Sequence, residues 1–181
     1  IECFDVSKKK PIKDLFYAMS HGVNRATLKK GKNDSRIHFL NSLIKKLDNI
    51  DYDFYGFQNK EPIWGNEFYK ALNNSKMGLN LSRGLPTKYY TSNRIASLMG
   101  NGLLTFVDKK TQLDDMFKND EVIMYKDIND LTDKINFYKK NDQLRKKIAS
   151  AGRNKYFKLF NELKISKYII NKSLGRSTSL Y

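Results

Sequence analysis

The chain has 181 residues, a length that fits one ordinary domain able to bury most of a core without disulfide bonds. Its single cysteine, Cys3, excludes an intramolecular disulfide, and one cysteine with two histidines cannot supply the four ligands of a structural zinc site. The apolar runs are too short to span a bilayer, so we expect a soluble protein of the reducing cytoplasm. Because the chain begins at Ile1 rather than at methionine, we treat it as a candidate fragment of a longer protein.

The formal net charge of +15 raises the question of a nucleic acid or an anionic membrane as partner. The lysines are spread along the sequence, however, and they greatly outnumber the arginines. We interpret this pattern as a general charge bias that would still attract a small polyanion. No nucleic-acid partner is expected, and peripheral contact with a membrane stays open.

Short apolar runs alternate with longer amphipathic stretches, which is the pattern of a parallel sheet covered by helices. Turn formers bound five runs that predict strands, at residues 15–19, 52–56, 77–81, 103–107 and 122–125. The fold class is therefore α/β, with a Rossmann-like, doubly wound parallel sheet, helices on both faces and additional C-terminal helices. No linker or repeat divides residues 1–181, so we expect a single domain in which residues 161–181 form a C-terminal helix and tail.

The loop after the first predicted strand is a candidate anion site, because ligands of open parallel sheets bind beyond the carboxyl ends of the strands. Its candidate residues are Ser20, His21, Gly22, Arg25 and Lys30. Glycine lets backbone amides approach an anion, and Arg25 and Lys30 would add charge-assisted hydrogen bonds to a diphosphate. The alternative is a surface turn with solvated cations. An apolar stripe then predicts a helix over residues 37–47, capped by Asp34 or Ser35.

The loop after the second predicted strand, residues 56–65, contains the only tryptophan of the chain. Such a loop forms a slot for a flat base, with Phe57 or Trp64 as its wall. The alternative role for Trp64 is packing at the sheet edge. A helix is predicted to begin near Asn66.

The stretch after the third predicted strand is the most informative one. Its candidate residues are Ser82, Arg83, Thr91, Ser92, Asn93 and Arg94. Thr91 or Ser92 would cap a helix beginning at Asn93, which leaves free amide groups and the positive end of the helix dipole facing a ligand. Arg83 and Arg94 are placed to clamp phosphate oxygens. The alternative is an ordinary capped helix between two strands.

The rest of the chain predicts a helix over residues 128–138 after the fifth strand, a longer one from Asp142 to about Phe160, and a third over residues 163–170. No strand follows them, so these helices complete the domain at its C-terminal end.

Several of these segments, in this order and spacing, resemble the C-terminal domain of group-1-type, CgeB-like glycosyltransferases of GT-B architecture. The matching segments are residues 54–56, 62–65, 75–83, 91–95 and 102–104. The loop over residues 20–31 resembles the opening loop of that domain, in which an arginine and a following Lys-Gly contact the donor diphosphate. The resemblance covers roughly residues 14–160.

This resemblance implies a bacterial-type enzyme of polysaccharide biosynthesis that transfers a sugar from a nucleotide-diphosphate donor to a saccharide, lipid or protein acceptor. The present chain would hold the donor, and a missing N-terminal Rossmann-like domain would hold most of the acceptor and supply any catalytic base. No cofactor and no obligatory metal are implied, because cations and a helix dipole stabilise the leaving diphosphate. Ser97 stands where many relatives have a glutamate that contacts the donor ribose, so ribose or sugar recognition would differ here.

Two other functions stay open at this point. One is a basic, non-catalytic nucleic-acid-binding module on an α/β scaffold, which would bind with a steep dependence on salt. The other is a degenerate glycosyltransferase domain used for protein interaction. The serine at position 97, where many relatives have a glutamate, is the reason to consider it.

Overall fold

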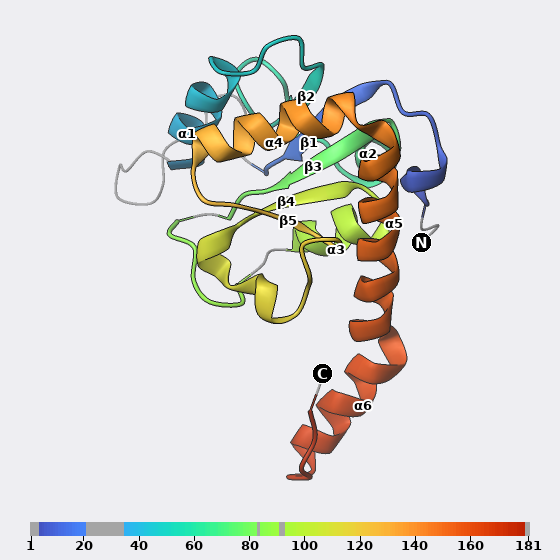
Figure 1. The fold of residues 1–181 in the computed structure, drawn as a ribbon. Coiled ribbons are helices and arrows are strands. Elements are labelled where there is room, and N and C mark those ends of the chain that lie inside the picture. Colours follow the sequence, from blue (N-terminus) through green and yellow to red (C-terminus); the bar gives the residue numbers. More distant parts are fainter. Residues whose placement is uncertain (1–3, 21–34, 83, 91–92, 180–181) are drawn as a thin grey trace.

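The five predicted strands are present at the predicted positions in the sequence, and they form one parallel sheet (Figure 1). The computed structural model describes residues 4–20, 35–82, 84–90 and 93–179. The strands are β1 (Lys13–Ala18), β2 (Tyr52–Tyr55), β3 (Ser75–Asn80), β4 (Leu104–Asp108) and β5 (Ile123–Tyr125). Their order in the sheet is β2-β1-β3-β4-β5. The chain therefore leaves β1 toward one edge and later continues on the other side of β1 with β3, which makes the gap between β1 and β3 a topological switch point.

The described residues form six α-helices. They are α1 (Ser35–Ile44), α2 (Gly65–Asn73), α3 (Asn93–Gly100), α4 (Ile128–Lys140), α5 (Asp142–Leu159) and α6 (Glu162–Ser173). Helices α1 and α4 cover one face, while α2 and α3 lie on the other (Figure 1). The predicted α/β class, with helices on both faces and additional C-terminal helices, is confirmed. The sequence patterns missed three short 3-10 helices at Val6–Lys8, Lys109–Thr111 and Leu113–Asp115.

Both faces of β1 are buried, which explains why its sequence is a continuous apolar run rather than an alternating one. Leu15 and Tyr17 join the core under α1 and α4, whereas Phe16 joins the core under α2 and α3. On β3, a side chain at Gly78 would place its Cβ only 2.3 Å from a methyl carbon of Leu98 in α3. Gly78 thus lets α3 lie close against the sheet.

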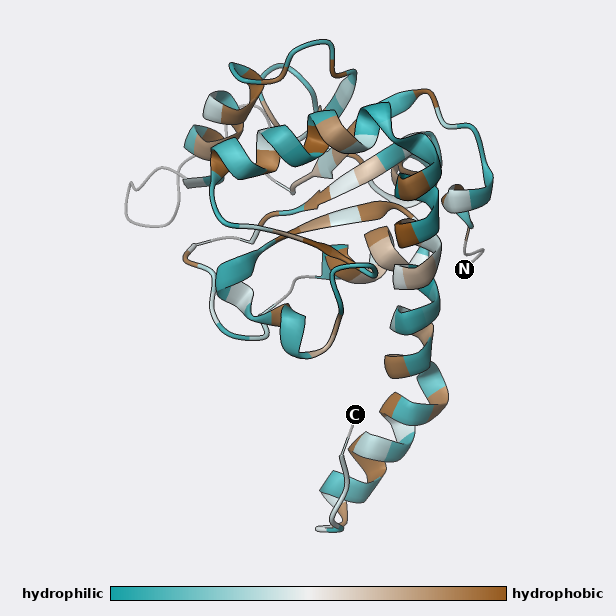
Figure 2. Ribbon diagram, viewed as in Figure 1, coloured by the Kyte–Doolittle hydropathy of each residue, from teal (hydrophilic) through white to brown (hydrophobic). Residues whose placement is uncertain are grey.

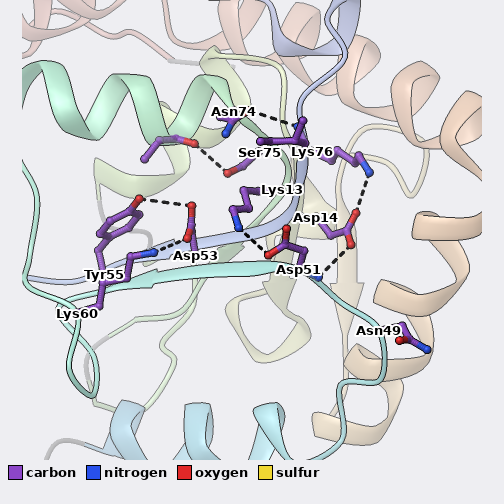
Figure 3. A network of polar contacts seen from close by, with 12 residues as sticks. Lys13, Asp14, Asn49, Asp51, Asp53, Tyr55, Lys60, Asn74, Ser75 and Lys76 are labelled. Carbon is purple, nitrogen blue, oxygen red and sulfur yellow. Dashed lines mark hydrogen bonds and ion pairs between the residues drawn. The ribbon is translucent and has the colours of Figure 1, made fainter.

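The amino edge of the sheet carries a network of ion pairs around Asp14 (Figure 3). The Asp14 carboxylate is 2.8 Å from the Lys76 ammonium and 2.8 Å from that of Lys139, and its side chain is only 3% exposed. It also accepts a hydrogen bond of 3.1 Å from the backbone amide of Asp51. Lys13 pairs with the Asp51 carboxylate at 2.7 Å. This edge therefore holds strands and helices together by mutually compensated charges.

Helix α6 projects away from the body of the domain at its C-terminal end (Figure 1). None of its residues is buried. Among the described residues, no helix has the length and apolar character needed to cross a membrane.

Candidate functional site

A cavity of about 850 Å³ opens at the carboxyl edge of the sheet, beside the end of β1. One side is formed by the β1 exit, with Ala18, Met19 and Ser20, and by Arg36 in the first turn of α1. Residues at the start of α2 and the start of α3 form the rest of the lining. The cavity therefore lies next to the switch point between β1 and β3, where open parallel sheets bind their ligands.

Arg94 ties the two strands of the switch point together. Its Nε donates a hydrogen bond of 3.1 Å to the carbonyl oxygen of Ala18 at the end of β1, and its Nη1 donates one of 2.8 Å to that of Leu81 just after β3. The guanidinium carbon lies 4.7 Å from the centre of the Tyr17 ring, a cation–π distance. Arg94 thus has a structural role at this edge while it also lines the cavity.

Two arginine side chains, Arg36 and Arg94, line the same cavity. Burial lowers the pKa of Arg94 from its usual range, and the positive charge of Arg36 lowers it further. The Arg36 side chain is itself only 6% exposed. Among the described residues that line the cavity, none is acidic. The lining is therefore cationic, which suits a ligand with more than one negative charge.

Another part of the cavity lining is aromatic. Trp64 precedes α2 and is 65% exposed, although it is the largest apolar side chain of the domain. Phe68 and Tyr69 from α2 and Tyr90 from the loop before α3 complete this part of the lining. Phe68 is held in place by an edge-to-face contact with Phe16, at 5.5 Å between ring centres. A flat aromatic group of a ligand would find a stacking surface here.

Five of the residues that the sequence put forward line this one cavity. They are Ser20, Trp64, Asn93, Arg94 and Ser97. The hydroxyl of Ser97 donates to the carbonyl oxygen of Asn93 one turn earlier, at 3.4 Å. Helix α3 begins at Asn93, as predicted from its capping pattern.

Two further predicted residues lie elsewhere. Phe57 is 3% exposed and packs edge-to-face on Phe54 in the core under α1, so Trp64 alone of the two aromatic candidates lines the cavity. Ser82 is 9% exposed and is not part of the lining. The remaining seven candidates lie outside the described residues, namely His21, Gly22, Arg25, Lys30, Arg83, Thr91 and Ser92.

The sequence reasoning missed Arg36, Tyr69 and Tyr90 in the cavity lining. A signal for the first two existed. A helix that follows a parallel strand begins at the carboxyl edge, so side chains in the first turns of α1 and α2 are near the ligand edge by topology. Tyr90 precedes α3 in an irregular loop, and no periodic pattern marks it.

A second hollow of about 520 Å³ lies at the outer edge of the sheet, beside β5. Its lining includes Lys109, Lys118 and Lys126 as well as Lys134, whose ammonium is bonded to the Met124 carbonyl and to Asp130. It is far from the switch point in sheet order. Within the described residues, no group of three or more His, Cys, Asp or Glu side chains is arranged to hold a metal ion.

Comparison with solved structures shows a similar fold in the crystal structure of TarM, with a TM-score of 0.64 and 16% sequence identity. The match covers 94% of this chain and 37% of the TarM chain, so the present chain spans little more than a third of that protein. No curated protein is significantly similar in sequence.

A family model described as glycosyl transferase-like matches residues 32–162, which is well over half of the 181 residues. The matched region runs from just before α1 to the start of α6 and so includes most of the described cavity lining. The chain therefore belongs to the glycosyl transferase-like family, which confirms the resemblance of its sequence to a group-1-type glycosyltransferase domain of GT-B architecture.

Proposed function

We propose that this domain binds the nucleotide-diphosphate sugar donor of a glycosyl-transfer reaction in the cavity between β1, α2 and α3. The observation that carries the proposal is the combination of two arginine side chains and several aromatic side chains in one cavity at the switch point. The diphosphate would lie against Arg36 and the start of α3, and the base or the sugar would lie against Trp64 and its aromatic neighbours.

In this reaction the bond between the anomeric carbon and the diphosphate oxygen breaks, and an acceptor oxygen forms the new bond to that carbon. The leaving nucleoside diphosphate gains negative charge in the transition state. Arg36 and the amide groups at the start of α3 would stabilise that charge because they are held in place before the reaction begins. Arg94 would act on the same charge from its fixed position across the two strand ends. The proposal requires no metal ion.

The match covers only 37% of the TarM chain. This supports the proposal that the present domain forms the site together with another part of a longer protein. We propose that a further Rossmann-like domain, outside the present chain, binds the saccharide, lipid or protein acceptor and supplies the base that takes the acceptor proton.

A calorimetric titration of the 181-residue chain with UDP, GDP and dTDP, free and linked to a sugar, tests the proposal. At least one nucleotide is expected to bind, and Arg36→Ala is expected to weaken that binding by about 10- to 100-fold, because a hydrogen bond to a charged group contributes ~1.5–3 kcal/mol. Arg176→Ala is the matched control, since it removes the same charge from the exposed C-terminal end.

Circular dichroism establishes whether each variant is folded, and Arg36→Lys keeps the charge if Arg36→Ala unfolds. The proposal fails if no nucleotide binds at millimolar concentration, or if both substitutions of Arg36 leave the affinity unchanged. Binding of RNA that falls steeply with salt, without any nucleotide binding, would point to a nucleic-acid module instead.

A further inference from the structure

The hollow of about 520 Å³ beside β5, called the β5 hollow below, has four lysines in its lining. They come from separate segments of the chain. Lys109 follows β4, Lys118 lies in the loop before β5, Lys126 follows β5, and Lys134 belongs to α4. A local run of solvated charge needs no fold, whereas these lysines lie around one hollow only because the fold brings their segments together.

Three of the four ammonium groups have no direct partner. Within the described residues, the side chains of Lys109, Lys118 and Lys126 form no hydrogen bond and no ion pair. Lys134 differs, because its ammonium group is 2.8 Å from the carboxylate of Asp130. The described lining contains one acidic side chain against four lysines, so the β5 hollow has an excess of positive charge.

Two carboxylates close to these lysines hold backbone amides. Glu121 accepts a hydrogen bond of 2.9 Å from the amide of Lys118, and Asp130 accepts one of 2.8 Å from the amide of Lys126. The backbone at both lysines is therefore held in place before a ligand arrives, while their ammonium groups stay open to it. Such preorganisation reduces the entropic cost of binding.

The buried part of the lining is apolar. Val122, Ile123 and Met124 are at most 8% exposed, Phe117 is 2% exposed, and Tyr138 of α4 is partly buried. Figure 2 shows that the segment between β4 and β5 is largely hydrophilic, next to the hydrophobic residues of the sheet. A ligand in the β5 hollow would therefore meet both apolar surface and cations, which is the usual make-up of a small-molecule site.

We propose that the β5 hollow binds a sugar unit that carries a negative charge, as a phosphate or a carboxylate group. Lys109, Lys118 and Lys126 give charge-assisted hydrogen bonds to the anionic group. Asp114 and Asn119, which also line the hollow, accept and donate hydrogen bonds to the sugar hydroxyls. The apolar part of the lining packs against the C–H groups of the sugar ring.

The lining favours this ligand over a nucleotide or a nucleic acid. Among the described residues of the β5 hollow, no aromatic ring is open to a base in the way that Trp64 is in the other cavity. Asp114 repels a chain of closely spaced phosphates, but it accepts hydrogen bonds from hydroxyls. In sheet order β5 is separated from β1 by β3 and β4, so this site is additional to the proposed donor cavity.

A nuclear magnetic resonance titration of the isotope-labelled 181-residue chain with glucose-6-phosphate, glucuronate and glucose tests the proposal. Both anionic sugars should shift the amide signals of residues 118–126, and glucose should bind at least about tenfold more weakly. Added salt should weaken the binding of the anionic sugars. Lys118→Gln with Lys126→Gln should reduce their affinity about tenfold or more, whereas the matched control, Lys45→Gln with Lys46→Gln at the exposed end of α1, should not.

Arg36→Ala separates this proposal from that of the donor cavity, because it should weaken nucleotide binding and leave the binding of glucose-6-phosphate unchanged. A titration with an oligogalacturonate distinguishes a sugar within a chain from a free sugar: tighter binding than glucuronate assigns the hollow to a chain, and equal binding assigns it to a free sugar. The proposal is wrong if glucose binds as well as the anionic sugars, if inorganic phosphate binds as tightly as glucose-6-phosphate, if the Lys118 and Lys126 variant binds like the wild type, or if Arg36→Ala abolishes sugar binding.

Discussion

The two edges of the sheet differ in the arrangement of their charged side chains. At the amino edge, the buried carboxylate of Asp14 pairs with Lys76 and accepts a hydrogen bond from the Asp51 amide (Figure 3). Its other oxygen pairs with Lys139. At the carboxyl edge, the cavity beside β1 has two arginine side chains and no acidic residue among its described lining. The amino edge therefore pairs its buried carboxylate with lysines, whereas the described lining of the cavity at the carboxyl edge is cationic.

Buried polar atoms without a hydrogen-bond partner occur near both edges of the sheet, because Arg145, one of the three residues concerned, donates its Nη1 to the Lys76 carbonyl near the start of β3. In the described residues, the buried side-chain atoms without a hydrogen-bond partner belong to Asn80, Tyr125 and Arg145. Asn80 and Tyr125 are the last residues of β3 and β5, both at the carboxyl edge. Buried polar groups without partners lower stability, so Asn80 and Tyr125 are positions at the carboxyl edge where a substitution can raise it. The amino edge therefore joins strands and helices through ion pairs, whereas the carboxyl edge carries the cavity and two buried polar side chains without partners.

The sharpest test of the amino edge is Asp14→Ala. The substitution leaves Lys76 and Lys139 without their shared carboxylate, and we expect the free energy of unfolding to fall by roughly 2–3 kcal/mol. The loss should be less than for a fully buried pair because both lysines remain partly exposed and can be hydrated. Urea denaturation measures it. The exposed Asp120→Ala is the control and should change stability by no more than about 0.5 kcal/mol; equal losses in the two variants would contradict the comparison.

The same carboxylate gives the amino edge a dependence on pH. Burial alone raises the pKa of Asp14, but hydrogen bonds from Lys139, Lys76 and the Asp51 amide outweigh it and hold the pKa below its usual value. The ionised form is thus stabilised by folding above the unfolded pKa of about 3.9, and this contribution disappears as the pH falls through the lower folded pKa.

We therefore expect the stability difference between the wild type and Asp14→Asn to be largest near neutral pH and to shrink as the pH falls below about 4. Denaturation at a series of pH values measures the difference. A gap that stays constant down to strongly acidic pH would show that Asp14 contributes through its shape and neutral hydrogen bonds instead of its charge.

At the carboxyl edge, Arg94→Met separates the structural role of Arg94 from its role in the cavity. The substitution removes the donors to the Ala18 and Leu81 carbonyls, so the free energy of unfolding should fall by about 1–2 kcal/mol even without a ligand. Arg176→Met is the exposed control. If Arg94→Met is as stable as the wild type but loses nucleotide binding, then Arg94 is a ligand contact only, and its bridge between β1 and β3 adds nothing measurable.

The sequence predicted most of the fold but only part of the site, for a physical reason. Strands and helices follow from apolar periodicity, which is local, and all five strands and the starts of α3 and α5 lie where the pattern put them. The cavity depends on which elements become neighbours. Arg36 enters it because α1 begins at the carboxyl edge, and Phe57 leaves it because its ring packs on Phe54. Neither outcome is visible in a residue's own sequence neighbourhood.

The smallest expected effect is at Asn80, and its sign is opposite to the others. Neither the nitrogen nor the oxygen of this 2% exposed amide has a partner, so the similarly shaped Asn80→Leu should raise the free energy of unfolding by up to about 1 kcal/mol. A thermal scan measures the increase, and Asn59→Leu, at an exposed turn, is the control. If the substitution instead destabilises the fold, the Asn80 amide has a structural partner, and its role is structural like that of Asp14. If it stabilises the fold and weakens nucleotide binding, Asn80 serves the ligand. The two measurements would then show that this residue lowers the free energy of unfolding and raises the affinity for the nucleotide.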